Sequence, residues 1–140
     1  MNTLNTFVLD TDHVTLHQRG HPQVIAQCRR LPPNLLAVTV ISIEEQMRGR
    51  LAQIGRNQED VAASYGRLGA TLDYFCELIV LPFDAAAHRR FDQLRGEGIR
   101  IGTLDLRIAA IVLQRSAILV TRNRRDFERV PGLKLEDWSQ

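Results

Sequence analysis

The chain has 140 residues, of which 44% are hydrophobic and 24% charged, a composition typical of an ordinary globular protein. This length predicts one domain, spanning residues 1–140, with a hydrophobic core of its own. The net charge of +2 is too small to indicate a nucleic-acid partner by itself. No apolar run approaches the roughly 20 residues needed to cross a bilayer, and the N-terminus lacks a signal-peptide pattern. We therefore expect a cytoplasmic protein without a membrane partner.

The first half of the sequence alternates between strand and helix patterns. A short apolar run at 6–10 predicts a strand, and the segment 21–30, with a proline in its opening turn, predicts a helix. The β-branched and apolar residues 35–41 predict a second strand. Ser42 then occupies the position of a helix N-cap, and Glu45, three residues later, has the spacing of a capping box.

The second half continues this alternation. Its predicted elements are, in order, a helix at 58–78, a strand at 79–83, a helix at 85–98 capped by Asp84, a helix from Thr103, a strand at 117–121, a polar loop at 122–127 and a short edge strand within 130–138. Strands that alternate with helices imply parallel pairing through right-handed crossovers. The sequence therefore predicts a three-layer α/β/α domain with a central, mainly parallel sheet of four to five strands.

Four acidic residues fall near one edge of the predicted sheet. Asp10 ends the first strand, Glu45 lies in the first turn after the second, and Asp126 lies just beyond the fourth. Asp105 lies in the first turn of the helix that precedes the fourth strand. Sites in such sheets form beyond the carboxyl ends of the strands. Each acid also has a plain structural interpretation: Glu45 could only complete a capping box, and Asp105 could only complement a helix dipole.

A cluster of these acids would need a counter-charge. Two carboxylates about 4 Å apart repel by roughly 4 kcal/mol at an effective dielectric constant near 20. Oxygen ligands without a Cys/His cluster favour Mg²⁺ or Mn²⁺ over zinc. Such ions serve phosphoryl-transfer chemistry, so the acids indicate a metal-dependent enzyme that acts on phosphate esters.

Several segments carry a family resemblance through their order and spacing. They are VLDTD (8–12), SIEEQMRG (42–49), GTLDLRIAA (102–110) and LVTRNRRDFERVPGLKLEDW (119–138). Together they resemble the successive motifs of PIN-domain endoribonucleases, and they are particularly similar to the VapC-type toxins of type II toxin–antitoxin pairs. The resemblance extends over nearly the whole chain and is weakest at 58–78.

The resemblance implies a PIN domain and an Mg²⁺- or Mn²⁺-dependent endoribonuclease that cuts RNA, such as tRNA or rRNA loops, to leave 5′-phosphate and 3′-hydroxyl ends. The catalytic and metal-binding acids that it implies are Asp10, Glu45, Asp105 and Asp126. It also implies a homodimer and a VapB-type antitoxin whose tail places a basic side chain among the carboxylates. A stand-alone RNA-processing nuclease and a non-catalytic binding scaffold are the alternatives; the presence of all the acids favours catalysis.

Further candidate residues lie beside the acids. Asp12 stands where the family usually has Asn, so we predict that it caps the following helix or tunes the site through its neighbours. Thr121 and Asn123 are predicted to hold water near Asp126. The arginines of the closing loop either contact the RNA backbone or form a solvated basic loop; they are Arg122, Arg124 and Arg125. An apolar stripe fits either an interface or the core; it comprises Leu51, Ile54, Leu68 and Leu72.

Other enzyme classes fit the sequence less well. The stretch DTDHV resembles the nucleophile motif of haloacid-dehalogenase-type phosphatases, whose chemistry also needs a lysine near the phosphate. The only lysine, Lys134, lies after the last acid. Neither a GxGxxG nor a P-loop motif occurs, so dinucleotide and P-loop functions have no support.

The histidines and cysteines do not predict a metal site. His13, His17 and His21 are spaced by four residues, but no HExxH pattern accompanies them, so a solvated helix face is the better interpretation. Cys28 and Cys76 lie far apart and outside any metal-binding motif. We predict that both are reduced, buried residues.

Overall fold

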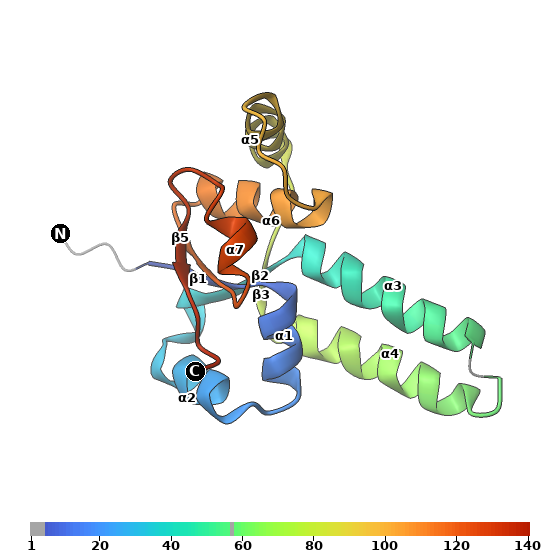
Figure 1. The fold of residues 1–140 in the computed structure, drawn as a ribbon. Helices are drawn as coiled ribbons and strands as arrows, with labels where there is room; N and C mark the ends of the chain where they lie inside the picture. The colour runs from blue at the N-terminus through green and yellow to red at the C-terminus, as the bar shows by residue number, and fades with distance from the viewer. Residues whose placement is uncertain (1–4, 57) are drawn as a thin grey trace.

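The computed structural model describes residues 5–56 and 58–140, and its centre is a sheet of five parallel strands (Figure 1). The strands are β1 (Phe7–Leu9), β2 (Leu36–Thr39), β3 (Ile79–Leu81), β4 (Ile118–Val120) and β5 (Lys134–Glu136). They lie in the order β3-β2-β1-β4-β5, and every neighbouring pair is parallel. The prediction of a mainly parallel sheet with a short edge strand near the C-terminus is therefore confirmed.

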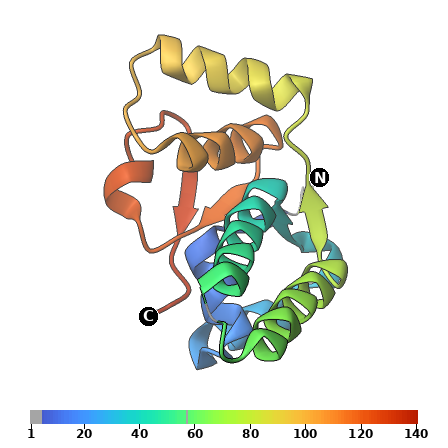
Figure 2. The same ribbon diagram turned by 90° about the vertical axis from the view of Figure 1, so that its right-hand side faces the viewer.

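Helices cover both faces of the sheet (Figures 1 and 2). They are α1 (Thr11–Gln18), α2 (Pro22–Arg30), the short 3₁₀ helix η1 (Pro33–Leu35), α3 (Val40–Arg56), α4 (Val61–Cys76), α5 (Ala85–Gly96), α6 (Thr103–Gln114) and α7 (Arg124–Phe127). Helices α5 and α6 pack on one face, and α1, α2 and the C-terminal end of α4 pack on the other. Helices α3 and α4 lie side by side and extend away from the sheet as a helical arm (Figure 1).

The strand sequences explain this division into three layers. In β1, Val8 packs into the core beneath α5 and α6, whereas Leu9 packs into the core beneath α1 and α2. Leu119 and Val120 of β4 divide between the two cores in the same way. Successive side chains of a strand point to opposite faces, and these four are completely buried. The central strands β1 and β4 are apolar throughout because helices cover both faces of the sheet there, whereas the edge strand β5 carries Lys134 and Glu136.

The boundary between β2 and α3 differs from the prediction. The strand ends at Thr39 and the helix begins at Val40, so Ser42 lies inside the helix, completely buried, and is not its N-cap. The Thr39 hydroxyl accepts the backbone N–H of Ser42 at 3.4 Å and so takes the capping role predicted for the serine. The β-branched run that ends at Ile41 fits a strand and a buried helix turn equally well, which explains the error.

Two helices lie in segments for which the sequence predicted no helix with defined ends. Helix α1 follows β1 directly, and Asp10 is its N-cap, accepting the backbone N–H of His13 at 2.8 Å. The loop predicted at 122–127 contains the single turn of α7, and its last residue, Phe127, is buried. By contrast, the predicted cap of α5 is confirmed, since Asp84 accepts the backbone N–H of Ala87 at 2.9 Å. No described helix is long and apolar enough to cross a membrane.

Candidate active site

A cleft of about 340 Å³ opens where the central strands end, and we call it the acidic cleft. Its lining residues are Asp10, Thr11, Asp12, Thr15, Glu45, Asp105, Asn123 and Phe127. Asp10 follows β1, Glu45 is carried by α3 after β2, and Asp105 is carried by α6. The structure thus brings three of the four predicted acids into one cleft, at the edge that the strand-end rule indicates. Asp126 lies outside the lining, but its charge acts on Asp105.

Asp10 is held rigidly at the mouth of the sheet. Its backbone N–H donates to Val120 of the neighbouring strand at 3.0 Å, and its carboxyl is only 8% exposed. One carboxylate oxygen, Oδ1, accepts the backbone N–H of His13 as the N-cap of α1. The cap fixes the orientation of the carboxylate and leaves Oδ2 available to a ligand.

His13 is buried directly behind Asp10, so the prediction of a solvated histidine face is wrong at this position. Its Nδ1 lies 3.3 Å from Asp10 Oδ1 without meeting the geometry of a hydrogen bond. Its Nε2 accepts the backbone N–H of Trp138 at 3.3 Å. With Nε2 as the acceptor, Nδ1 is the ring nitrogen that carries a proton, and it faces the carboxylate. His13 therefore connects Asp10 to the C-terminal segment.

The other histidines of the predicted series also have separate structural partners. His17 Nδ1 lies 2.6 Å from the Tyr74 hydroxyl, and burial lowers the pKa of His17. His21 caps α2 through its imidazole, which accepts the backbone N–H of Val24 at 3.4 Å. The three imidazoles have different partners, so they do not form a common metal site.

Glu45 is oriented by a residue from another helix. Thr11, in the first turn of α1, donates its hydroxyl to Glu45 Oε1 at 2.8 Å and lies 2.9 Å from the Ser42 hydroxyl. Glu45 thus faces the cleft and does not complete a capping box with Ser42. Its neighbour Glu44 points elsewhere and forms a salt bridge with Arg48 at 2.6 Å. Nothing in the local sequence indicated the role of Thr11.

Asp105 is the electrostatically unfavourable member of the cluster. Burial, and to a smaller extent the charges of Glu45, Asp10 and Asp126, together raise its pKa from 3.8 to about 6. Each of these effects disfavours the ionised carboxylate. A cation in the cleft would reverse the preference, because it would neutralise the same group of charges.

Asp126 is held by its own loop. Asn123 caps α7 by accepting the backbone N–H of Asp126 at 3.4 Å, and its side-chain N–H donates to Asp126 Oδ2 at 3.0 Å. The Thr121 hydroxyl accepts the backbone N–H of Asn123 at 2.9 Å. These polar groups orient the loop and the carboxylate; the water-holding role of Thr121 and Asn123 stays a prediction.

Asp12 forms an ion pair on the rim of the cleft. Arg122 donates to Asp12 Oδ2 from Nε at 2.9 Å and from Nη2 at 2.7 Å, and about half of each side chain is exposed. The prediction that Asp12 caps the following helix is wrong, because Asp10 has that role. Arg124 and Arg125 are exposed near the cleft, whereas the charge of Arg122 is already compensated.

The donor set suits Mg²⁺ or Mn²⁺ in its chemistry, since all the acids offer oxygen. Within residues 5–56 and 58–140, no three His, Cys, Asp or Glu side chains are already arranged around one metal position. Mg²⁺ does not require such an arrangement, because it keeps several waters and is commonly bound by one or two carboxylates. Asp10, Glu45 and Asp105 line the cleft together and could supply such carboxylates.

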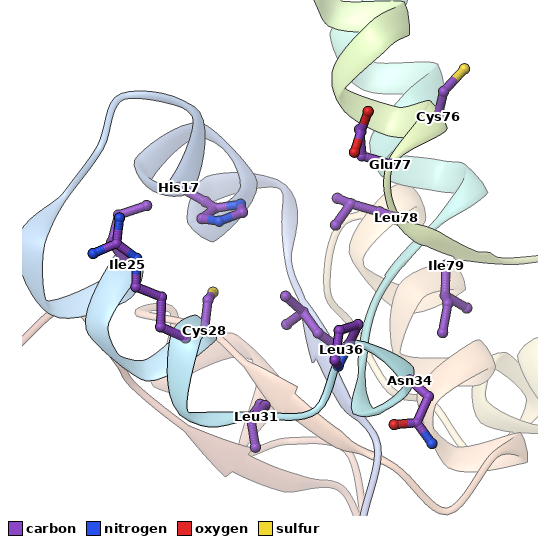
Figure 3. Close-up of a pocket in the computed structure, with 12 residues that line it drawn as sticks. His17, Ile25, Cys28, Leu31, Asn34, Leu36, Cys76, Glu77, Leu78 and Ile79 are labelled. Atoms are coloured by element: carbon purple, nitrogen blue, oxygen red, sulfur yellow. The ribbon is translucent and has the colours of Figure 1, made fainter.

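A larger hollow of about 720 Å³ lies elsewhere, between α2 and the end of α4 (Figure 3). Mainly apolar side chains line it, and we call it the apolar hollow. Burial raises the pKa of Cys28, in its wall, to about 11, so this thiol stays neutral. Cys76, which also lines the hollow, is exposed, so the prediction that both cysteines are buried is wrong for it. Lys134 lines another hollow with Ser116 and Gly132, away from the acids, which argues against a phosphatase.

Comparisons with known proteins identify the family. No protein-family model matches the chain. Ribonuclease VapC2 of Rickettsia felis is 38% identical over 141 residues, an alignment that covers 96% of this chain and 98% of the relative. The chain belongs to the VapC family. The resemblance inferred from its motifs is therefore confirmed.

Other VapC proteins agree in sequence and fold. The tRNA(fMet)-specific endonuclease VapC of Salmonella typhimurium is 29% identical over 136 residues, covering 94% of this chain and 97% of the relative. The crystal structure of DNA-bound VapBC from Salmonella typhimurium superposes with a TM-score of 0.78 at 27% identity, covering 96% of this chain and 99% of that one. VapBC2 from Rickettsia felis, bound to a promoter DNA fragment, gives a TM-score of 0.76 at 27% identity, with coverages of 95% and 98%. The predicted PIN fold is confirmed.

Proposed function

We propose that this chain is an Mg²⁺- or Mn²⁺-dependent endoribonuclease and the toxin of a toxin–antitoxin pair. The observation that carries the proposal is the acidic cleft, where neighbouring carboxylates and burial raise the pKa of Asp105 to about 6. Such a cluster is costly unless it binds a cation. The names of relatives, a ribonuclease and a tRNA-specific endonuclease, support RNA as the substrate.

Each acid has a distinct place in the proposed mechanism. Asp10 and Asp105 would hold the metal ion, supported by Glu45 and Asp126. When bound, the ion supplies Lewis-acid stabilisation of phosphate charge and lowers the pKa of water. Glu45 has Oε1 fixed by the Thr11 hydroxyl, so its Oε2 is free to orient the attacking water and hold its proton. In-line attack on phosphorus would leave 5′-phosphate and 3′-hydroxyl ends.

The proposed partners are a VapB-type antitoxin and a second copy of the chain. The solved neighbours are VapBC complexes, and a basic side chain from such a partner would complement the carboxylates of the acidic cleft. On the helical arm, Leu51 is 58% exposed, Leu72 is 55% exposed and Tyr65 is 58% exposed. Exposed apolar side chains of this size support an interface at Leu51 and Leu72 of the predicted apolar stripe, whereas Ile54 and Leu68 of that stripe are partly buried.

Cleavage of RNA by the purified chain tests the proposal. We expect cleavage with Mg²⁺ or Mn²⁺, loss in EDTA, and no recovery with Zn²⁺. Asp10→Asn should lower kcat/KM by about 10³-fold or more, since it removes a cation ligand. Asp92→Asn is the matched control, because Asp92 is 61% exposed on α5 and, among the described residues, forms an ion pair only with His88, at 3.7 Å. Wild-type rates for Asp10→Asn would refute the proposed site.

Expression in cells tests the toxin assignment separately. Production of the wild-type chain should inhibit translation and arrest growth, whereas Asp10→Asn should not. Co-expression of a small antitoxin encoded beside the gene should restore growth. RNA cleavage in vitro without growth arrest would instead favour a stand-alone RNA-processing nuclease.

A further inference from the structure

A second hollow of about 340 Å³ adjoins the acidic cleft and is lined by basic side chains. It lies between α1, α3 and α4, and we call it the arginine hollow. Its lining residues are Thr15, Gln18, Arg19, Arg50, Arg67, Ala70, Thr71 and Tyr74. Thr15 lines both the arginine hollow and the acidic cleft, so the two share a wall. No carboxylate is among the lining residues.

Two of the three guanidinium groups in this hollow, those of Arg50 and Arg67, are held by neutral hydrogen-bond partners. Arg50 donates its Nε to the hydroxyl of Thr71 at 2.9 Å, which ties α3 to α4. Arg67 donates to neutral partners only, Nη2 to Ser64 at 3.2 Å and Nε to Gln53 at 3.3 Å. Within the described part of the chain, no carboxylate forms a salt bridge with Arg19, Arg50 or Arg67.

Other arginines of the same chain have their charge compensated by a carboxylate. Arg48, two residues before Arg50, pairs with Glu44, and Arg122 at the rim of the acidic cleft pairs with Asp12. Three like charges that line one hollow repel each other, and this cost is reversed when an anion enters. A hollow of this kind therefore selects a negatively charged ligand.

Arginine favours a particular anion. Its planar fork of N–H groups matches the oxygens of a phosphate, and Arg50 is pre-oriented by Thr71, so little side-chain freedom is lost on binding. A polyanionic strand that enters the acidic cleft also needs positive charge beside it, because the carboxylates repel every phosphate other than the one that a cation neutralises.

We propose that the arginine hollow is a phosphate-binding subsite for the RNA strand, holding a phosphodiester that flanks the scissile one. The subsite rests on the proposed function, since it takes the same RNA as the acidic cleft. Its role is to position the strand across Thr15, independent of base identity, because phosphate contacts carry no sequence information.

Binding of a fluorescein-labelled single-stranded RNA 12-mer, measured by anisotropy in EDTA, tests the subsite without cleavage. Arg19→Gln/Arg50→Gln should raise Kd by about 10- to 100-fold. It should also reduce the slope of log K against log salt by about 0.7, since the variant loses its contact with one phosphate of the single strand. The single variant Arg19→Gln controls for misfolding of the double variant, because the exposed Arg19 side chain makes no hydrogen bond to the described residues. We expect this single variant to raise Kd about fivefold.

Arg89→Gln/Arg115→Gln is the charge-matched control. Arg89 lies on α5, which α6 separates from the sheet (Figure 1). Arg115 follows the C-terminal end of α6, whereas Asp105 lies in the first turn of the same helix. Ten residues of helix separate Arg115 from Asp105 by about 15 Å. The control should change Kd by less than about threefold. Equal losses in the control and in Arg19→Gln/Arg50→Gln would overturn the subsite, leaving only general charge attraction.

Neutral methylphosphonate linkages, placed one at a time along the RNA, locate the bound phosphate. In the wild type, one linkage beside the cleaved bond should weaken binding more than its neighbours. This sensitivity should disappear in Arg19→Gln/Arg50→Gln, because the protein variant and the neutral linkage remove the two sides of the same contact. Sensitivity that persists in the variant overturns the proposal.

The outcomes also separate the subsite from the proposed function. RNA binding that depends on the arginines, without any cleavage, would support the subsite and contradict the nuclease. Cleavage by a wild type whose arginine variants bind and cut RNA normally would contradict the subsite alone. Variants that bind RNA normally but lose the antitoxin would show that the hollow takes carboxylates of the partner protein, which also overturns it.

Discussion

The acidic cleft and the apolar hollow show opposite uses of enclosed space. The apolar hollow is about twice as large, 720 Å³ against 340 Å³, yet it offers little chemistry. In it, burial raises the pKa of Cys28 to about 11 and leaves a neutral, unreactive thiol. In the cleft, burial and neighbouring charges act on Asp105 in the same direction and together raise the pKa of its carboxyl to about 6. Unfavourable electrostatics, and not volume, indicate the site.

Topology explains why the two regions differ. The acidic cleft lies at the carboxyl ends of β1 and β4, where the chain reverses its direction of travel across the sheet. The apolar hollow contains Leu36 and Ile79, the first residues of β2 and β3, and therefore lies at the opposite edge. Parallel sheets place ligand sites beyond the carboxyl ends of strands, because a crevice forms at the point of reversal, where the connections from neighbouring strands lead to opposite faces.

Asp105→Asn should give the largest effect, lowering the cleavage activity while raising the stability of the fold. Loss of a cation ligand should lower kcat/KM by about 10³-fold or more. The same change removes a partly buried charge from beside other carboxylates, so the free energy of unfolding should rise by about 1–2 kcal/mol near pH 7.5 in EDTA. Cleavage assays and thermal unfolding of one preparation measure both. A variant that is inactive and also destabilised would contradict this account.

The pH dependence tests the electrostatic origin of that gain. Because the pKa of Asp105 is raised from 3.8 to about 6, the folded chain binds a proton that the unfolded chain has released. Stability therefore falls as pH rises through this window, and Asp105→Asn should remove that fall. The Tm advantage of the variant should be present above about pH 6 and vanish as pH approaches 4. Equal advantages at about pH 4 and about pH 8 would refute the mechanism.

Leu36→Ala tests the apolar hollow and should have the reverse effect, lowering stability while leaving cleavage nearly unchanged. Leu36 is 9% exposed and belongs to the core beneath α1 and α2. Its truncation should lower the free energy of unfolding by about 2–3 kcal/mol, toward the low end for buried leucines because the side chain already borders a hollow. Cleavage below the Tm should stay within about twofold of wild type, since no acid of the cleft moves. Strong loss of cleavage in a folded variant would mean that the two regions are coupled.

The thiols offer a milder test of the same hollow. With a pKa of about 11, Cys28 should be almost fully protonated near pH 8 and should react slowly with a thiol reagent. Cys76 is exposed and should account for the single fast phase. Cys76→Ser should abolish that phase, and labelling of Cys76 should leave cleavage unchanged. Rapid reaction of both thiols would show that the hollow opens readily to solvent.

The fold was largely predictable because its signals are local. Apolar runs predicted all five strands, and Asp84 predicted the start of α5 through a contact with Ala87, three residues away. The start of α3 was mistaken because the β-branched run before it fits either element, and the Thr39 hydroxyl decides the outcome. Pattern rules therefore recover elements better than their boundaries.

The site was only partly predictable because its supporting contacts are long-range. The strand-end rule placed Asp10, Glu45 and Asp105 at one edge, and the structure brings them into one cleft. Thr11 holds Glu45 across 34 residues of sequence. His13 Nε2 accepts the backbone N–H of Trp138, 125 residues away. No local periodicity encodes such partners, so the sequence could not show what orients the acids.

Asp12→Asn should have the smallest effect, which distinguishes the rim of the acidic cleft from its interior. Asp12 is about half exposed and contacts Arg122, whereas Asp10 is 5% exposed at the end of β1. An exposed ion pair contributes roughly 0–1 kcal/mol, so the Tm should change by less than about 4 °C. The change also frees Arg122, so RNA should bind slightly more tightly, and kcat/KM should stay within about threefold of wild type. In Asp12→Asn/Arg122→Gln the binding gain should disappear while cleavage persists. A loss as large as that expected for Asp10→Asn would make Asp12 a cation ligand and extend the catalytic set to the rim.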